Sequence, residues 1–316
     1  MSFMQCGNAV HFYRLHSGPG LRSSSGLRLG FGSGGSASGG SASGGSGSGG
    51  SGPGLRLGAE PRESLAPVLP AGAPVIVFIN ALGTDHRIWD GVLAALPADL
   101  SALVYDQRGQ GLTEWVEGRC DVESSSEDLA QLLDGLGIGP VVLCGLSLGG
   151  LVAQAFALSH PERVRALCLC ATAARIGSPE LWRERAEQVQ QGGLAAVAAQ
   201  VIERWFSPTF FERQPSAARG WRVLLERAPT AGYLAALRLL AETDLRSRVG
   251  QISVPTLVLA GAADVATPPD QVRALAQAIA GAEFVVLPGA GHLLCVEEPG
   301  SLVRSLDEFL GGKGIV

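Results

Sequence analysis

"LCGLSLGG", residues 143–150, places Ser147 between Gly145 and Gly149, directly after the apolar run of residues 141–145. A helix-like pattern follows at residues 148–159. Two glycines suit an ordinary tight turn, but G-x-S-x-G between a strand and a helix is typical of a sharp turn that exposes a nucleophilic serine. No other serine of the chain has this pattern. The stretch therefore predicts a nucleophile at Ser147.

Short apolar runs recur along the chain and predict the strands of a sheet. They are VIVFI (75–79), ALVYD (102–106), VVLCG (141–145), ALCLC (166–170), TLVLA (256–260) and EFVVL (283–287). Helical patterns lie between most of them, at residues 126–136, 148–159, 270–279 and 301–310. Nearly continuous apolar strands that alternate with helices are typical of a doubly wound, mostly parallel α/β sheet.

The interval between Cys170 and Thr256 has no convincing strand. It carries helical patterns at residues 181–191, 194–205, 217–227 and 233–240. Ligands of open α/β sheets bind beyond the carboxyl ends of the strands. We therefore expect residues 175–250 to form an inserted helical cap above the site, and residues 74–174 and 251–316 to form the core.

The amino-terminal part divides into two segments. Residues 1–16 predict a hairpin of the core sheet with a turn at Gly7 and Asn8. Residues 32–52 contain only Gly, Ser and Ala, so we predict that 17–73 is a mostly disordered insert. Its G-x-G-x-x-G matches, for example at residues 30–35 and 45–50, follow no strand and open no helix, and we expect no dinucleotide site there.

Composition excludes several classes of protein. The 316 residues carry a formal net charge of −5, which argues against nucleic-acid and anionic-membrane partners. No apolar run approaches the ~20 residues of a membrane helix, and we find no secretory signal. Cys144, Cys168 and Cys170 lie in apolar runs that suit reduced core thiols. We expect a cytoplasmic protein that needs no cofactor and no metal.

A serine nucleophile needs a base and an acid that orients the base. His292 follows the last predicted strand in a glycine-rich loop, where the chain order Ser, Asp, His requires a late histidine. Asp264 follows the strand at 256–260 and is the predicted third member, with Asp270 as the alternative. The amide groups of Leu82 and Leu148 are the expected oxyanion donors.

Further motifs indicate which family of proteins the sequence resembles. The set FINALGTDHRIWD (78–90), YDQRGQG (105–111), CATAARIGSPELW (170–182), RWFSP (204–208), TPP (267–269) and GHLLCVEEP (291–299) resembles the 3-oxoadipate enol-lactonase family of the α/β-hydrolase fold. The resemblance runs from about residue 74 to 310. Ser147, Asp264 and His292 fall on the family's catalytic triad, and Leu82 and Leu148 fall on its oxyanion positions.

The sequence also departs from that family. Gln110 stands where the family usually has histidine, Ala81 where serine is common, and Leu148 where methionine is common. The first change alters hydrogen bonding near the site, whereas the other two leave the backbone donors in place.

The resemblance implies a hydrolase that opens 3-oxoadipate enol-lactone in aromatic catabolism. A broader carboxylesterase, a cofactor-free perhydrolase and a catalytically silent ligand-binding relative are the alternatives. The acetate arm of the lactone is anionic, so a pocket that binds it needs a cation. Arg175 and Trp205 are the predicted substrate-binding residues, with Arg204 and His86 as alternative cations. Arg175 could instead pair with Glu180.

Overall fold

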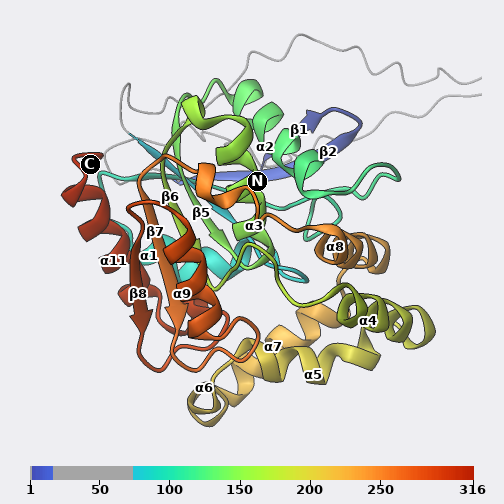
Figure 1. Ribbon diagram of the computed structural model, residues 1–316. Coiled ribbons are helices and arrows are strands. Elements are labelled where there is room, and N and C mark those ends of the chain that lie inside the picture. Colours follow the sequence, from blue (N-terminus) through green and yellow to red (C-terminus); the bar gives the residue numbers. More distant parts are fainter. Residues whose placement is uncertain (1, 17–73) are drawn as a thin grey trace, which may run out of the picture. The chain divides into compact units, whose positions relative to one another are not determined.

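The computed structural model describes residues 2–16 and 74–316 (Figure 1). The predicted insert at residues 17–73 lies outside the described residues.

One sheet organises these residues, with the strand order β1-β2-β4-β3-β5-β6-β7-β8. Its strands are β1 (Ser2–Cys6), β2 (Ala9–His16), β3 (Val75–Ile79), β4 (Ser101–Tyr105), β5 (Val141–Leu146), β6 (Val164–Cys170), β7 (Thr256–Gly261) and β8 (Glu283–Leu287). β2 pairs antiparallel with β1 and β4, and the pairs from β4 to β8 are parallel. The predicted mostly parallel α/β sheet is thus confirmed.

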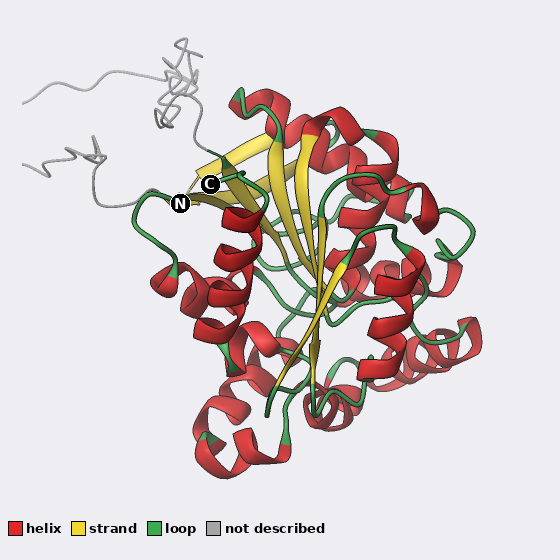
Figure 2. Ribbon diagram, turned by 60° about the vertical axis from the view of Figure 1, so that its left-hand side comes forward, coloured by secondary structure: helices red, strands yellow, loops and turns green. Residues whose placement is uncertain are grey.

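The centre of the sheet is buried on both faces. Every residue of β3, β4 and β5 is buried, which is why these strands read as continuous apolar runs rather than as an alternating pattern. Helices lie on both sides of the strands (Figure 2). The parallel strands point their carboxyl ends toward one edge, so the loops that follow β3, β5, β7 and β8 meet there.

Helices of the core connect these strands. They are α1 (Asp90–Ala95), α2 (Val122–Leu136), α3 (Leu148–Ser159), α9 (Pro269–Ala278), α10 (Leu294–Glu297) and α11 (Pro299–Gly312). Short 3₁₀ helices lie at η1 (His86–Trp89), η2 (Pro161–Arg163) and η3 (Val249–Gln251). The Asp121 carboxylate accepts from the amide of Ser124, and the Ser124 hydroxyl accepts from the amide of Asp121, so α2 begins at Val122.

Five helices lie between β6 and β7, in the interval where the sequence predicts a cap (Figure 1). They are α4 (Pro179–Gly192), α5 (Ala195–Trp205), α6 (Pro208–Arg213), α7 (Pro215–Glu226) and α8 (Thr230–Glu242). α4 packs on α8, and α5 packs on α7. In residues 2–16 and 74–316, no helix is long and apolar enough to cross a membrane.

Candidate active site

The turn between β5 and α3 holds Ser147 in a strained backbone conformation. Its φ of 55° and ψ of −114° are rare for a residue with a side chain, and its amide donates to the Cys170 carbonyl at 2.9 Å. A Cβ on Gly145 would lie 2.3 Å from the Gly149 oxygen, and one on Gly149 would lie 2.3 Å from the Ile79 oxygen. Both glycines are therefore needed to bring strand, turn and helix this close.

His292 and Asp264 come together at the carboxyl edge of the sheet. Asp264 follows β7 and His292 follows β8, and the His292 Nδ1 lies 2.9 Å from Asp264 Oδ2. Ser147 and His292 line one cavity. Asp270, the alternative acid, lies in α9, so the structure pairs His292 with Asp264.

The Asp264 carboxylate is held by three further hydrogen bonds. The amides of Ala266 and Thr267 donate to Oδ1 at 2.7 and 3.0 Å, and the Thr267 hydroxyl donates to Oδ2 at 2.6 Å. Burial raises the pKa of Asp264, but His292 and these hydrogen bonds outweigh burial, so the pKa lies below its ordinary value. Thr267, which sequence reasoning did not single out, thus helps to keep Asp264 ionised beside His292.

Leu82 and Leu148 present backbone amides beside the serine. Leu148 is the first residue of α3, where amides lack intrahelical partners, and Leu82 follows β3 and lines the Ser147 cavity. Within the described residues, neither amide donates a hydrogen bond to another protein group. Both N–H groups are therefore available for an oxyanion.

The Ser147 cavity has a volume of about 190 Å³ and is covered by helices of the cap interval. Its lining from that interval comprises Ile176, Gly177, Leu181, Trp182, Arg185, Val201, Arg204, Trp205 and Leu240. The Trp205 carbonyl accepts from the amide of Leu293 at 2.9 Å, which ties α5 to the loop that carries His292. Trp205 is thus placed at the cavity, as its predicted substrate contact requires.

Two arginines bring positive charge to this mainly apolar cavity. Arg185 is 8% exposed, and its guanidinium lies 5.4 Å from the Trp182 ring. Burial and then the charge of Arg185 lower the pKa of Arg204. Among the described residues, neither arginine has a carboxylate within 4.0 Å. The cavity therefore offers two guanidinium groups to an anionic ligand.

Arg185 could have been found from its helical spacing. Trp182, Arg185 and Val189 are the buried residues of α4, at i, i+3 and i+7. They place an arginine on the buried face of a helix whose other face is charged, and arginine is rarely buried without a partner.

The structure places Arg175 outside the lining of the Ser147 cavity. Its guanidinium pairs with Asp244 at 3.1 Å, rather than with Glu180, and it lines a different cavity from the one that contains Ser147. The carboxylate of Asp244, which lies 69 positions away in the sequence, is shared between Arg175 and Arg246. His86 is engaged as well, because its Nδ1 lies 2.9 Å from Asp106 Oδ1.

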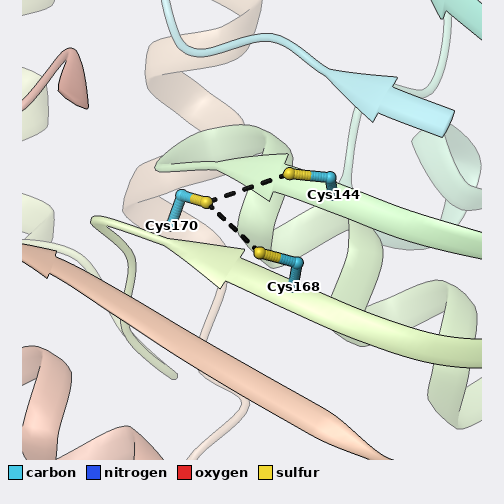
Figure 3. A group of neighbouring side chains, drawn as sticks. All are labelled: Cys144, Cys168 and Cys170. Atoms are coloured by element: carbon cyan, nitrogen blue, oxygen red, sulfur yellow. Dashed lines mark hydrogen bonds between the residues drawn. The ribbon is translucent and has the colours of Figure 1, made fainter. Parts of the chain in front are cut away.

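One cluster of potential soft-metal ligands lies inside the sheet. The Cys170 sulfur is 3.9 Å from that of Cys144 and 3.7 Å from that of Cys168, and all three residues are fully buried (Figure 3). Burial, followed by the neighbouring thiols, raises the pKa of Cys144 well above its ordinary value. These features suit neutral thiols packed in an apolar core.

A second cluster, formed by Asp85, His86 and Asp106, is occupied by hydrogen bonds of the protein itself. The Asp106 carboxylate accepts from the amides of His86 and Leu112, and the Asp85 carboxylate binds the Arg87 guanidinium. The cluster therefore holds the loop that follows β3 and has little capacity left for a cation.

Comparisons with known proteins agree with this geometry. The model of the alpha/beta hydrolase fold family matches residues 74–299. The chain is 35% identical over 241 residues to 3-oxoadipate enol-lactonase 1 of Acinetobacter baylyi, covering 76% of this chain and 90% of that relative.

Solved structures show the same relationship. The enol-lactonase from Burkholderia xenovorans LB400 has a TM-score of 0.79 at 31% identity, covering 98% of this chain and all of that one. A thermophilic esterase from Thermogutta terrifontis, solved with malate bound, has a TM-score of 0.71 at 35% identity over 76% of this chain and 90% of that one. The chain therefore belongs to the α/β-hydrolase fold family, as a hydrolase related to the 3-oxoadipate enol-lactonases.

Proposed function

We propose that this protein hydrolyses 3-oxoadipate enol-lactone through an acyl-enzyme on Ser147. The observation that carries the proposal is a cavity of about 190 Å³ that is lined by Ser147 and His292. Arg185 and Arg204 line the same cavity, and neither has a carboxylate partner among the described residues. Such a volume suits a small substrate rather than a long acyl chain. The relatives named enol-lactonases support the choice of lactone.

Acylation begins when the Ser147 hydroxyl attacks the lactone carbonyl and His292 takes its proton. Asp264 orients the imidazole and stabilises its positive charge. The amides of Leu82 and Leu148 bind the oxyanion of the tetrahedral intermediate. When the intermediate collapses, the ring C–O bond breaks and an enolate leaves, still tethered to the acyl chain.

The enolate needs little help as a leaving group, because its charge is delocalised over oxygen and carbon. It takes up the proton from His292 and becomes a ketone. His292 then removes a proton from water, which attacks the Ser147 ester and releases 3-oxoadipate. Ser147 regains its proton in the same step, so the cycle needs no cofactor.

Arg185 and Arg204 bind the acetate arm of the lactone in this proposal. A guanidinium donates paired N–H groups to a carboxylate, and such charge-assisted bonds are strong in a cavity that excludes water. Trp182 and Trp205 also line the cavity and provide apolar surface. The lactone carbonyl is thereby fixed over Ser147.

A spectrophotometric assay of enol-lactone loss tests the proposal. We expect kcat/KM for the lactone to exceed that for p-nitrophenyl acetate and p-nitrophenyl butyrate by at least a hundredfold. Rapid ester hydrolysis with negligible lactone opening would contradict it and favour a broader carboxylesterase. That second candidate is supported by the 35% identity to the thermophilic esterase.

A further inference from the structure

We propose that Gln110 is a positioning residue that fixes the oxyanion donor Leu82. The inference rests on the proposed function in one respect, namely that the Leu82 amide binds the oxyanion. Gln110 is 4% exposed, and its Oε1 accepts from the amide of Gly83 at 2.9 Å. It therefore acts on the residue directly after the donor.

The peptide that contains the Leu82 N–H is anchored through its carbonyl. The Ala81 oxygen accepts from the Thr84 amide at 3.3 Å, the Thr84 hydroxyl at 2.9 Å and the Asn80 side-chain amide at 3.2 Å. The C=O and N–H of a planar trans peptide point in opposite directions. Holding the Ala81 carbonyl within the loop thus directs the Leu82 N–H away from the loop.

The following peptide is anchored by Gln110. Gly83 has a φ of +71°, and a Cβ there would lie 2.7 Å from Leu225 Cδ1 and 2.9 Å from Tyr233 Cε2. The Gly83 N–H is the amide next to the donor Leu82, and it donates its hydrogen bond to Gln110 Oε1. Leu82 is consequently held from both sides, and its own N–H is the one left to face the cavity.

Gln110 is itself held in place by the turn that follows β4. Its amide donates to the Gln107 carbonyl at 2.9 Å, and its carbonyl accepts from Thr113 at 3.0 Å. The Gln107 side-chain amide donates to the Asn80 carbonyl at 2.6 Å. The two loops are therefore joined at Asn80 and again at Gly83, on either side of Leu82.

Substituting Gln110→Met tests this role, because methionine keeps the length and removes the acceptor. Loss of a whole oxyanion donor costs about 10²–10³ in kcat, so misplacing one is expected to lower kcat by about ten- to a hundredfold. KM should stay within about threefold, since the oxyanion exists only in the transition state. Binding of a trifluoromethyl ketone, which mimics that state, should weaken by the same factor as kcat.

Two further variants separate positioning from stability. Gln110→His supplies a neutral ring nitrogen of similar reach and should restore kcat to within about fivefold of the parent. Thr256→Val removes a buried hydroxyl that bonds to the Val254 carbonyl at the opposite end of β7, and should leave ketone binding unchanged.

All variants are compared on p-nitrophenyl acetate as well as on the lactone. The effect of Gln110 on kcat can then still be measured if the protein does not hydrolyse the lactone. If Gln110→Met binds the ketone as tightly as the parent, Gln110 does not position Leu82. Equal loss of ketone binding in Gln110→Met and Thr256→Val would overturn the proposal too, because it would show a general effect of stability.

Discussion

Replacing Arg185 by methionine is expected to remove the preference for an anionic lactone. Arg185 is 8% exposed, and it shares the cavity with Arg204. Truncating one partner of a buried charge pair costs about 2–5 kcal/mol, and Arg204 retains part of the interaction. We therefore expect a loss of about 2–3 kcal/mol, which is roughly 30- to 150-fold in kcat/KM for the lactone.

The neutral ester p-nitrophenyl acetate is the internal comparison, because it has no carboxylate to bind. Its kcat/KM should change by less than about threefold, since methionine keeps an apolar contact with Trp182. Arg175→Met is the matched control, because Arg175 pairs with Asp244 and lines another cavity. Equal losses on both substrates in Arg185→Met, or a selective loss in Arg175→Met, would show that Arg185 does not bind the carboxylate of the lactone.

Two other substitutions test the packing of the turn and the acid of the pair. Gly149→Ala would place a Cβ 2.3 Å from the Ile79 oxygen, so we expect calorimetry to show a Tm lower by about 4 °C or more. Gly300→Ala is the control and should have little effect on the Tm, because a Cβ there would have no atom within 4 Å. Asp264→Asn should destabilise the protein at neutral pH. Because the folded pKa of Asp264 is lowered, its contribution is present above pH ~4 and is lost as the pH falls through the folded pKa. Thermal melts against pH should therefore converge for the parent and Asp264→Asn in acid; a constant difference would contradict this.

Much of the fold follows from local patterns in the sequence. The run at 75–79 is β3 without a change of bounds, because all five residues are buried and apolar. β6 begins at Val164, two residues before the predicted strand, since the exposed Arg165 interrupts the apolar run. α2 begins four residues earlier than its apolar pattern indicates, because a reciprocal cap between Asp121 and Ser124 starts the helix within a polar stretch.

Some residues of the candidate site can be predicted from sequence motifs, whereas others depend on tertiary packing. Ser147, Asp264 and His292 can be predicted as neighbours from the turn motif and from the strands they follow, because a parallel sheet gathers those loops at one edge. The helical spacing of Trp182, Arg185 and Val189 indicates that Arg185 is buried, but it does not indicate that Arg185 lines the Ser147 cavity, because that depends on how α4 packs in the folded chain. The pairing of Arg175 with Asp244 cannot be read from the sequence, because the two residues are distant in sequence and close only in the folded chain.

The identity of the nucleophile is tested most directly by labelling the parent and Ser147→Ala with a fluorophosphonate and following lactone opening in both. We expect one adduct in the parent, mapped to Ser147 by peptide mass spectrometry. We expect no adduct in the variant and a fall in kcat of about 10⁴-fold or more, with an unchanged circular dichroism spectrum. An adduct on another residue, or a variant that opens the lactone within tenfold of the parent rate, would contradict the assignment of Ser147 as the nucleophile.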